Sequence, residues 1–340
     1  MFKKYNKCIY CDSSNLKKEK KQNFLENFYI KAIRSDLNLS KKQLGIIKVY
    51  KCGRCHILQN NPWFFEDTVK RIYSNIYGQH NRSWSNLINF IKKGKKPNHG
   101  LLYNIIKKKI KIRNYAEYNS PFMGLFINFF EDEYKKNRNF YKNFSKNIIK
   151  YLISRQVAGK SKNTQKLSSI KAKKFLNKIN LLKRKKIKKR IINKYLFVDN
   201  SSLSWGQNDN YKSVNSKSYA TEIFDLKTLD LNNRNKDINI DLFGIFHTLD
   251  HTFKPNKVLN FALDISKYVV VYCHIDERLN KQHLFSLTKD FLKYLNKKKV
   301  YSLNLTKIID KKFFSPELYF VCSRQKKCIN KLAIDVNKKN

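Results

Sequence analysis

Four cysteines form the pattern in this chain with the most specific chemistry. They stand as two Cys-x-x-Cys pairs, "CIYC" at Cys8 and Cys11 and "CGRC" at Cys52 and Cys55. The spacing within each pair lets two thiolates point at one cation, and four thiolates in a tetrahedral arrangement favour Zn2+. Because all four ligands would be thiolates, no coordination position stays open for chemistry, so the predicted zinc is structural. A redox role or a chance arrangement is the alternative.

The residues around the pairs refine this prediction. Residues 12–51 form a longer segment than a zinc ribbon usually has between its pairs, so we expect a helix-containing insertion there. Gly53 is expected to allow the tight backbone of the second turn. His56 follows the second pair directly and could replace a cysteine as a ligand, although a surface position is the simpler interpretation. Cys273 and Cys322 lie inside apolar runs and are interpreted as core residues.

A second set of polar side chains follows apolar runs, where strands are expected to end. In a parallel α/β sheet, ligands bind at the carboxyl ends of the strands, near the point where strand order reverses. The candidates at these ends are Glu117, Tyr118, Asn119, Asp199, Asn200, Ser201, Asp225, His247, Thr248, Asp250, His251, His274, Asp276 and His283. Acids at successive strand ends could hold ribose hydroxyls and an adenine amino group. For each acid alone, a helix N-cap or turn role is the competing interpretation.

The elements that must position these side chains are predicted from apolar runs and their spacing. Strands are predicted at 112–117, 194–199, 219–226, 240–247, 268–275, 299–305 and 318–324. Between them, "KPNKVLNFALDISK" and "LFSLTKDFLKYLNK" have helical apolar spacing. Near-continuous apolar strands that alternate with helices favour a mostly parallel sheet with both faces covered. The short connection between the last two strands favours an antiparallel hairpin. We therefore predict an α/β fold with a doubly wound, mostly parallel seven-stranded sheet whose last strand is antiparallel.

Residues 134–194 interrupt this alternation with a concentration of positive charge. This basic block holds 22 Lys and Arg residues and no Asp or Glu. Apolar residues at helical spacing between Phe140 and Leu152 predict one helix, and a second helix from about Leu167 to Ile192 completes a predicted helical hairpin. The predicted division of the chain is a zinc-ribbon-like element (1–62), a helical linker region (63–111) and an α/β domain (112–340) that carries the basic block as an insertion.

The whole chain is strongly basic, with 72 Lys and Arg against 25 Asp and Glu and a net charge of +47. Such a charge attracts polyanions such as nucleic acid, anionic lipid surfaces or acidic glycans. AT-biased codons would produce much of the surplus without any ligand, but they explain the acid-free basic block less well. No run approaches the roughly 18 apolar residues of a membrane span, and the start of the chain lacks the apolar region of a signal peptide. We expect a soluble, cytoplasmic protein.

From Ile112 onward the chain resembles class I S-adenosylmethionine-dependent methyltransferases, which have a seven-stranded sheet with an antiparallel last strand. The most specific match is "DLFGIFHTLDHTFKPNKVLNFAL", which is similar to the fourth-strand motif of that family. The residues that fall on the motif are Asp241, His247, Leu249, Asp250, His251 and Pro255, with Asp250 in place of the usual glutamate. "KQHLFSLT" is similar to the segment after the fifth strand in many sugar and small-molecule methyltransferases. The sugar C-methyltransferase-like branch also carries an N-terminal zinc-ribbon-like element.

The resemblance implies roles for the strand-end residues. Glu117 matches the acid of the family's first glycine-rich motif, Asp199 the acid that holds the ribose, and Asp225 the residue near the adenine. The implied cofactor-binding residues are Glu117, Tyr118, Asn119, Asp199, Asp225 and His247. A transferred methyl group also needs a base where the acceptor carries a proton. The candidate catalytic bases are His251, His247 and His283.

The first motif departs from the family in its loop. The pattern E-x-G-x-G-x-G reads Glu117-Tyr-Asn119-Ser-Pro121-Phe-Met123 here, so all three glycines are replaced. Asn119 can adopt left-handed backbone, whereas Pro121 fixes φ near about −65° and offers no amide donor. We therefore expect a rebuilt loop, with Gly124 as its one glycine.

Two functions of different classes follow from these patterns. The first is methyl transfer from S-adenosylmethionine to a small molecule or to a nucleotide-sugar or glycan precursor. The second is a methyltransferase-like protein without cofactor, which binds nucleic acid or another polyanion through the basic block and the ribbon. Docking of the basic block on an anionic membrane surface is a third. A metal site built from the histidines is disfavoured, because no carboxylate–histidine signature accompanies them.

Overall fold

The computed structural model describes residues 1–19, 28–72, 99–118, 124–125, 128–129, 194–199, 220–225, 240–246, 248–275, 283–306 and 317–337. The helical hairpin predicted for the basic block lies outside these residues. The chain forms two compact units. The first unit is Met1–Ile72 together with His247–Asn340, and the second unit is Tyr73–Phe246.

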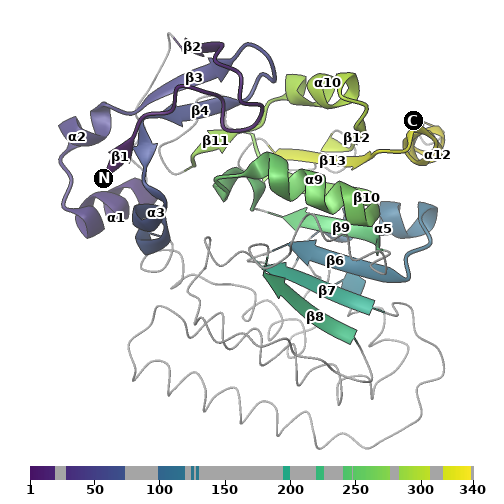
Figure 1. Ribbon diagram of the computed structural model, residues 1–340. Coiled ribbons are helices and arrows are strands. Elements are labelled where there is room, and N and C mark those ends of the chain that lie inside the picture. Colours follow the sequence, from purple (N-terminus) through teal and green to yellow (C-terminus); the bar gives the residue numbers. More distant parts are fainter. Residues whose placement is uncertain are drawn as a thin grey trace, which may run out of the picture. The chain divides into compact units, whose positions relative to one another are not determined.

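The N-terminal part of the first unit is a small β-rich module, residues 1–19 and 28–64, which we call the cysteine module. Its strands are β1 (Phe2–Lys3), β2 (Leu16–Lys18), β3 (Lys48–Cys52), β4 (Leu58–Asn61) and β5 (Trp63–Phe64). β3 pairs antiparallel with β2 and β4, and β1 pairs antiparallel with β5. On its other side β4 pairs with β11 (Phe285–Ser286), a short strand from far along the sequence (Figure 1). A strand pair therefore joins the module to the rest of the first unit.

Helices fill the segment between β2 and β3, which confirms the helix-containing insertion predicted from its length. They are α1 (Phe28–Leu37) and α2 (Lys41–Gly45), and α3 (Glu66–Ile72) follows β5. At the start of α2, the Gln43 N–H donates to Ser40 Oγ at 3.1 Å and the Ser40 N–H donates to Gln43 Oε1 at 2.8 Å. This reciprocal capping box satisfies two amide donors that a helix start otherwise leaves open.

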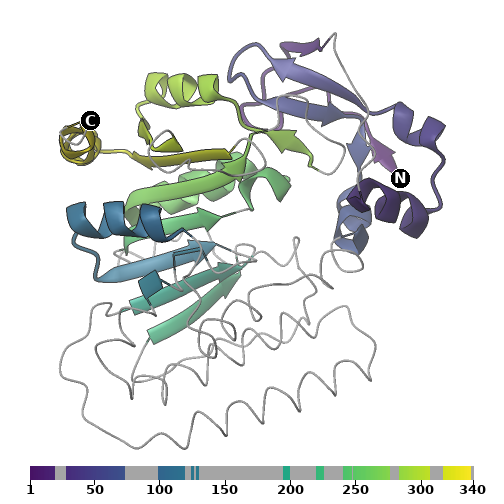
Figure 2. The same cartoon turned by 180° about the vertical axis from the view of Figure 1, so that it is seen from behind.

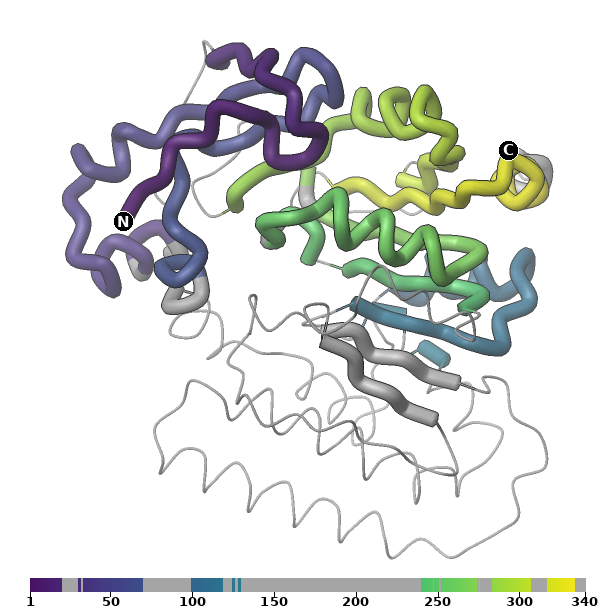
Figure 3. The backbone as a smooth tube through the Cα atoms, viewed as in Figure 1, coloured from purple at the N-terminus to yellow at the C-terminus, as the bar shows by residue number. Residues whose placement is uncertain are grey.

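The C-terminal part of the first unit contains helices and antiparallel strands. They are the 3-10 helix η4 (Leu249–His251), α9 (Pro255–Ile265), β10 (Ser266–His274), α10 (Lys289–Lys297), β12 (Tyr301–Asn304), β13 (Glu317–Ser323) and α12 (Lys326–Asn337). β13 lies between β12 and β10 and is antiparallel to both. Figure 3 traces this part from α10 to the yellow β13 and α12. The antiparallel pairing of β12 with β13 confirms the predicted closing hairpin.

The second unit contains α5 (Gly100–Lys109), β6 (Asn114–Tyr118), β7 (Lys194–Asp199), β8 (Ala220–Asp225) and β9 (Ile240–Phe246). Its strands pair parallel in the order β9-β6-β7-β8 (Figure 2). β6 therefore lies between the strand that follows it in the chain and a strand that comes much later. The strand order reverses at β6, and in doubly wound sheets ligands bind beyond the carboxyl ends of the strands at such a reversal.

β6 is held at its start and along one face by other parts of the second unit. At its start, the backbone N–H groups of Arg113 and Asn114 donate to Asp241 Oδ2 at 2.8 and 3.1 Å. On one face of the strand, the Tyr115 ring packs on Phe129 with ring centroids 4.9 Å apart, and Phe129 packs edge-on against Tyr103 of α5 at 4.9 Å. These contacts fix the direction in which the carboxyl end of β6 points.

The predicted strands agree with the observed ones to within two residues at each end. One prediction was wrong: the stretch "LFSLTKDFLKYLNK" is not helical throughout, because Phe285–Ser286 is strand β11 and α10 begins only at Lys289. The edge of β4 supplies the hydrogen-bonding partner that turns these residues into a strand. The domain boundaries predicted from the sequence stay a prediction. Within the ranges that the structure describes, no helix is long and apolar enough to span a membrane.

Candidate metal centre and candidate binding sites

The two Cys-x-x-Cys pairs lie on two turns with the same backbone hydrogen bond. In the first turn the Asp12 N–H donates to the Cys8 carbonyl at 3.0 Å, and in the second the His56 N–H donates to the Cys52 carbonyl at 3.0 Å. Asp12 and His56 both have left-handed backbone, with φ of 56° and 62°. The residue after each pair therefore closes its turn, and His56 acts as a turn residue.

Gly53 has a different role from the one predicted. The backbone of Gly53 is not left-handed, so the turn does not require a glycine for its dihedral angles. A Cβ at Gly53 would lie 2.5 Å from Asn15 Nδ2, and the Gly53 N–H donates to the Asn15 carbonyl at 2.9 Å. Glycine is needed because the segment before β2 packs directly on this position.

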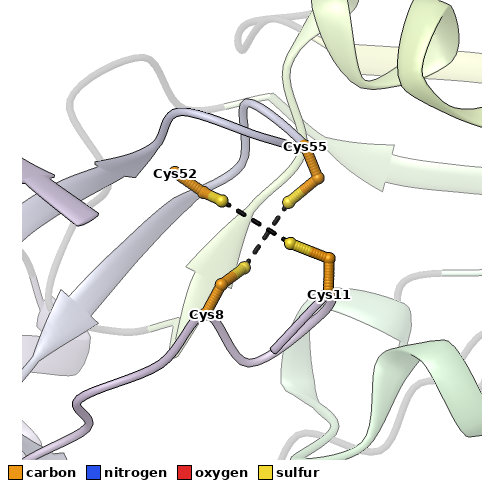
Figure 4. A group of neighbouring side chains, drawn as sticks. All are labelled: Cys8, Cys11, Cys52 and Cys55. Atoms are coloured by element: carbon orange, nitrogen blue, oxygen red, sulfur yellow. Dashed lines mark hydrogen bonds between the residues drawn. The ribbon is translucent and has the colours of Figure 1, made fainter. Parts of the chain in front are cut away.

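The four paired thiols converge on one point (Figure 4). The Sγ atoms of Cys8 and Cys55 are 3.4 Å apart, those of Cys11 and Cys52 are 3.6 Å apart, and all four lie within 4.8 Å of one another. A tetrahedral zinc site with Zn–S bonds of about 2.3 Å separates its sulfur atoms by about 3.8 Å. The thiols therefore fit a four-coordinate ion of this size without rearrangement of the two turns.

The surroundings make these thiols unequal. The hydrogen bond with the Cys55 thiol, aided by backbone N–H groups of Cys11 and Tyr10, lowers the pKa of Cys8 to about 6. Burial raises the pKa of Cys11 to about 12, and the hydrogen bond with Cys8 together with burial raises the pKa of Cys55. A cation that binds here would displace the protons that Cys11 and Cys55 hold.

The first cysteine turn also packs on the C-terminal part of the first unit. Tyr10, inside the first pair, is buried and meets the Phe291 ring of α10 edge-on, with ring centroids 4.8 Å apart. The ring centroid of Tyr294, on the same helix, lies 6.1 Å from the ring centroid of Tyr10. On the second turn, the Thr288 hydroxyl donates to the His56 carbonyl at 2.9 Å. Both cysteine turns therefore contact the segment that contains β11 and α10.

In the second unit, Glu117 lies near the carboxyl end of β6 and is buried, with 1% of its surface exposed. The Tyr115 hydroxyl, on the same face of the strand, donates to Glu117 Oε2 at 2.5 Å. This reach depends on Gly244 of β9, where a Cβ would lie 2.5 Å from the Tyr115 hydroxyl. The predicted cofactor-loop acid is thus a fixed, hydrogen-bonded carboxyl at the point of strand reversal.

Gly124 lies close to the Glu117 carboxyl. Its φ is +33°, and a Cβ there would lie 2.8 Å from Glu117 Oε2 and overlap the Phe246 ring. Phe246 in turn packs against the His99 ring at 4.9 Å between centroids, and burial lowers the pKa of His99 to about 4. A glycine is therefore required at Gly124, which lies one position beyond the family motif. The resemblance to that motif gave Gly124 no role.

The other predicted cofactor residues of the second unit are described in part. Tyr118 is buried at the end of β6, and Asp199 and Asp225 are directly opposite each other at the carboxyl ends of β7 and β8. Tyr118 is paired with Val198, one residue before Asp199, so the three residues end neighbouring strands together. Asn119 and the rest of the loop to Met123 lie outside the described residues, as does His247.

In the first unit, the structure brings together Asp250 and His283. Asp250 Oδ2 lies 3.8 Å from His283 Nε2, and both side chains are buried. Burial raises the pKa of Asp250 to about 7, so this carboxyl can hold a proton near neutrality. The 3.8 Å separation is an ion-pair distance and exceeds that of a direct hydrogen bond, so the ionised carboxyl stabilises the protonated imidazole by charge. His251 has its backbone in η4, and its side chain is not among those described.

A buried acid on β13 was missed by sequence reasoning. Glu317 accepts hydrogen bonds from the hydroxyl groups of Tyr272 and Tyr319, the latter at 3.2 Å. The two tyrosine rings stack with centroids 4.3 Å apart. The signal would have been the antiparallel register of β10 and β13, which places Tyr272 opposite Tyr319 and which no local pattern reveals.

Comparison with known proteins adds little to this geometry. No protein-family model and no curated protein matches the sequence. A crystal structure of the selenomethionine-substituted CurJ carbon methyltransferase is similar, with 9% sequence identity and a TM-score of 0.28. The match covers 75% of this chain, and the chain spans only 57% of that structure. A similarity of this extent supports no conclusion about activity, so the proposals below rest on the residues themselves.

Proposed function

We propose that the protein is a methyltransferase that uses S-adenosylmethionine and acts on a small molecule or on a nucleotide-sugar or glycan precursor. The observation that carries this proposal is the end of β6, where the strand order reverses and Glu117, Tyr118, Asp199 and Asp225 terminate adjacent parallel strands. The single seven-stranded sheet predicted from the sequence is part of the same proposal.

The polar groups at these strand ends suit an adenosine. Carboxylates at the ends of β7 and β8 are acceptors for ribose hydroxyls and for an adenine amino group. Gly124 supports a close approach of backbone at this edge, because a side chain there would collide with Phe246 and Glu117. We assign cofactor binding to Glu117, Tyr118, Asn119, Asp199, Asp225 and His247.

When bound, the cofactor supplies an electrophilic methyl group. The protein's own task is then to align the acceptor, exclude water and remove a proton where the acceptor carries one. His251, His247 and His283 are the proposed bases. His283 has the best-supported environment of the three, because the buried Asp250 carboxyl lies 3.8 Å from its Nε2 atom.

We further propose that the four-cysteine cluster holds a structural Zn2+. The sulfur separations of 3.4 and 3.6 Å support this assignment, since they are close to those of a tetrahedral thiolate site. With four protein thiolates as ligands, the ion would staple the two turns and take no part in methyl transfer.

Calorimetric titration with S-adenosylhomocysteine tests the methyltransferase proposal. The wild-type protein should bind it, and Asp199→Ala and Asp225→Ala should each weaken binding by about tenfold or more, because a hydrogen bond to a charged group is lost. Asp264→Ala is the matched control, since Asp264 is an exposed acid of the first unit paired with Arg324 at 2.6 Å. Absence of heat and of any thermal shift at about millimolar ligand would remove the proposal.

A second candidate function is binding of a polyanion without cofactor. It is favoured by the net charge of +47 and by the 61-residue basic block, residues 134–194, which contains no acid. Nucleic acid is the partner that this charge suits best, with an anionic membrane surface as the alternative polyanion.

A further inference from the structure

Strand β4 of the cysteine module has an unusual composition for a buried strand. Its residues Gln59, Asn60 and Asn61 are 1%, 0% and 5% exposed. Amide side chains this deeply buried are stable only when they are hydrogen-bonded. The hydrogen-bond partner of each amide therefore identifies the segment that β4 holds in place.

Gln59 and Asn61 hold the chain that leads into the first cysteine turn. The Ile9 N–H donates to Gln59 Oε1 at 3.0 Å. Asn61 binds Tyr5 twice, accepting from its N–H at 2.9 Å and donating from Nδ2 to its carbonyl at 2.7 Å. These two amides therefore serve the cysteine module itself.

Asn60 forms hydrogen bonds with the C-terminal part of the first unit. Its Nδ2 atom donates to the His283 carbonyl at 2.7 Å, and its backbone N–H donates to the Leu284 carbonyl at 2.8 Å. The pairing then continues into β11, with Phe285 opposite Gln59 (Figure 1). The backbone at His283 is thus fixed by β4, directly beside the side chain that faces Asp250.

We propose that Asn60 is a positioning residue: by holding the main chain at His283 and Leu284, strand β4 of the cysteine module keeps the His283 imidazole against Asp250. The cysteine module then sets the geometry of a candidate base, beyond its role as a folding staple. The inference rests on the proposed function only in so far as His283 serves as a base. The hydrogen bonds and the 3.8 Å approach to Asp250 exist independently of the reaction.

The chain offers a closely matched pair of variants, Asn60→Leu and Asn61→Leu. Both remove a buried asparagine from the same strand, and both remove an Nδ2 bond of 2.7 Å to a main-chain carbonyl. They differ in the partner, which is His283 for Asn60 and Tyr5 for Asn61. If Asn60→Leu does not fold, Asn60→Ser is the replacement, because it is smaller and its hydroxyl is too short to reach the His283 carbonyl.

The test is the rate at which diethyl pyrocarbonate modifies His283 in the full-length, metal-loaded protein, followed by mass spectrometry. His283 should react about tenfold faster in the Asn60 variant than in the wild type, and at the wild-type rate in Asn61→Leu. His56, beside Cys55, should react equally in both variants, which shows that the cysteine turns are intact. In spectra of histidine-labelled protein, the His283 imidazole peak should shift in Asn60→Leu and in Asp250→Asn, and stay in place in Asn61→Leu.

Equal His283 rates in the wild type and in the Asn60 variants would overturn the proposal, as would an equal increase in Asn61→Leu. Binding of S-adenosylhomocysteine to the wild type is measured on the same samples. A protein that binds none of it loses the proposed function, whereas the His283 rates still decide the role of Asn60.

Discussion

At the scale of single residues, Gly124 and Gly45 have opposite surroundings. A Cβ at Gly124 would overlap the Phe246 ring and press on Glu117, and the backbone there is left-handed, whereas a Cβ at Gly45 would meet nothing within 4 Å. The same change, glycine to alanine, should therefore have opposite consequences at the two positions.

Gly124→Ala should lower the free energy of unfolding by about 1–3 kcal/mol, because overpacking and a strained dihedral angle combine. Gly45→Ala should change it by less than about 1 kcal/mol. Urea denaturation of both variants measures the difference. Equal stability of the two variants would show that Gly124 is not packed against Phe246 and Glu117 as described.

The buried carboxyl of Asp250 makes a contribution to the free energy of unfolding that depends on pH. Burial raises the pKa of Asp250 from 3.8 to about 7, so the folded state keeps a proton that the unfolded chain releases within this interval. The contribution of Asp250 to the free energy of unfolding should therefore fall as pH rises from about 4 to about 7, by about 1.4 kcal/mol per unit at most. Among the described residues, the titratable neighbours of this carboxyl include His283 at 3.8 Å and the buried Cys273.

Asp250→Asn removes this titration, so the variant should gain about 2 kcal/mol relative to the wild type between pH 5 and pH 8. Chemical denaturation at several pH values checks this difference, with the exposed Asp264→Asn as the control. A constant difference between the variant and the wild type across that range would mean that Asp250 is ionised throughout.

Single residues also show what the sequence could and could not predict. The cysteine pairs are local, and their spacing alone predicted the cluster that the structure brings together. Asp250 and His283 were both named from the sequence, but their contact joins distant segments and depends on how β4 holds β11. Glu317 was missed because a single acid in an apolar run gives no signal until its tyrosine partners are known from the register.

At the scale of elements, apolar runs predicted β9 and β13 well because these two strands are buried by their own composition. β9 and β13 are buried at every residue, and both were placed correctly. β4 and β11 were not predicted. The letters "LQNN" are typical of a loop, and β11 has only two residues, so both become strands through their neighbours: β4 pairs with β3 and β11, and β11 pairs with β4.

The cysteine cluster and the β4–β11 pair should therefore be linked in stability. If the cluster holds Zn2+ as we propose, Cys55→Ser should abolish or strongly weaken its binding, and the turns that carry β4 should then loosen. Amide hydrogen exchange at Leu284 to Ser286 should then become about tenfold faster or more.

Cys328→Ser is the control for this experiment, because Cys328 lies on α12 outside the four-cysteine cluster. Metal content by elemental analysis and exchange by mass spectrometry are measured on the same protein. Unchanged exchange in metal-free Cys55→Ser would show that β4 holds β11 without help from the cluster.

At the scale of the whole molecule, the excess positive charge predicts salt-dependent binding of a polyanion, which the fold alone does not predict. If the basic block binds RNA, the logarithm of the binding constant should fall linearly with the logarithm of salt concentration, with a slope of about −0.7 for each phosphate contact. Replacement of Lys185, Lys186 and Lys188 by Gln should reduce the slope by about 2, because three contacts are removed.

The matched control removes three charges elsewhere, by changing Lys107, Lys108 and Lys109 of α5 to Gln. Filter binding of single-stranded RNA over a range of salt concentrations compares the variants. Identical slopes for the wild type and both variants would mean that the basic block makes no phosphate contacts. Its charge would then reflect amino-acid composition alone.

The pairing of β4 with β11 has a consequence for biosynthesis. Asn60 and His283 are separated by 223 positions. At about 5–20 residues per second, a ribosome needs about 10–45 s to complete the second after the first. The four thiols belong to turns that end by position 56, so the nascent chain can bind the proposed zinc ion long before the partner strand is made. An ion acquired early would give the late-made segment a finished template on which to dock.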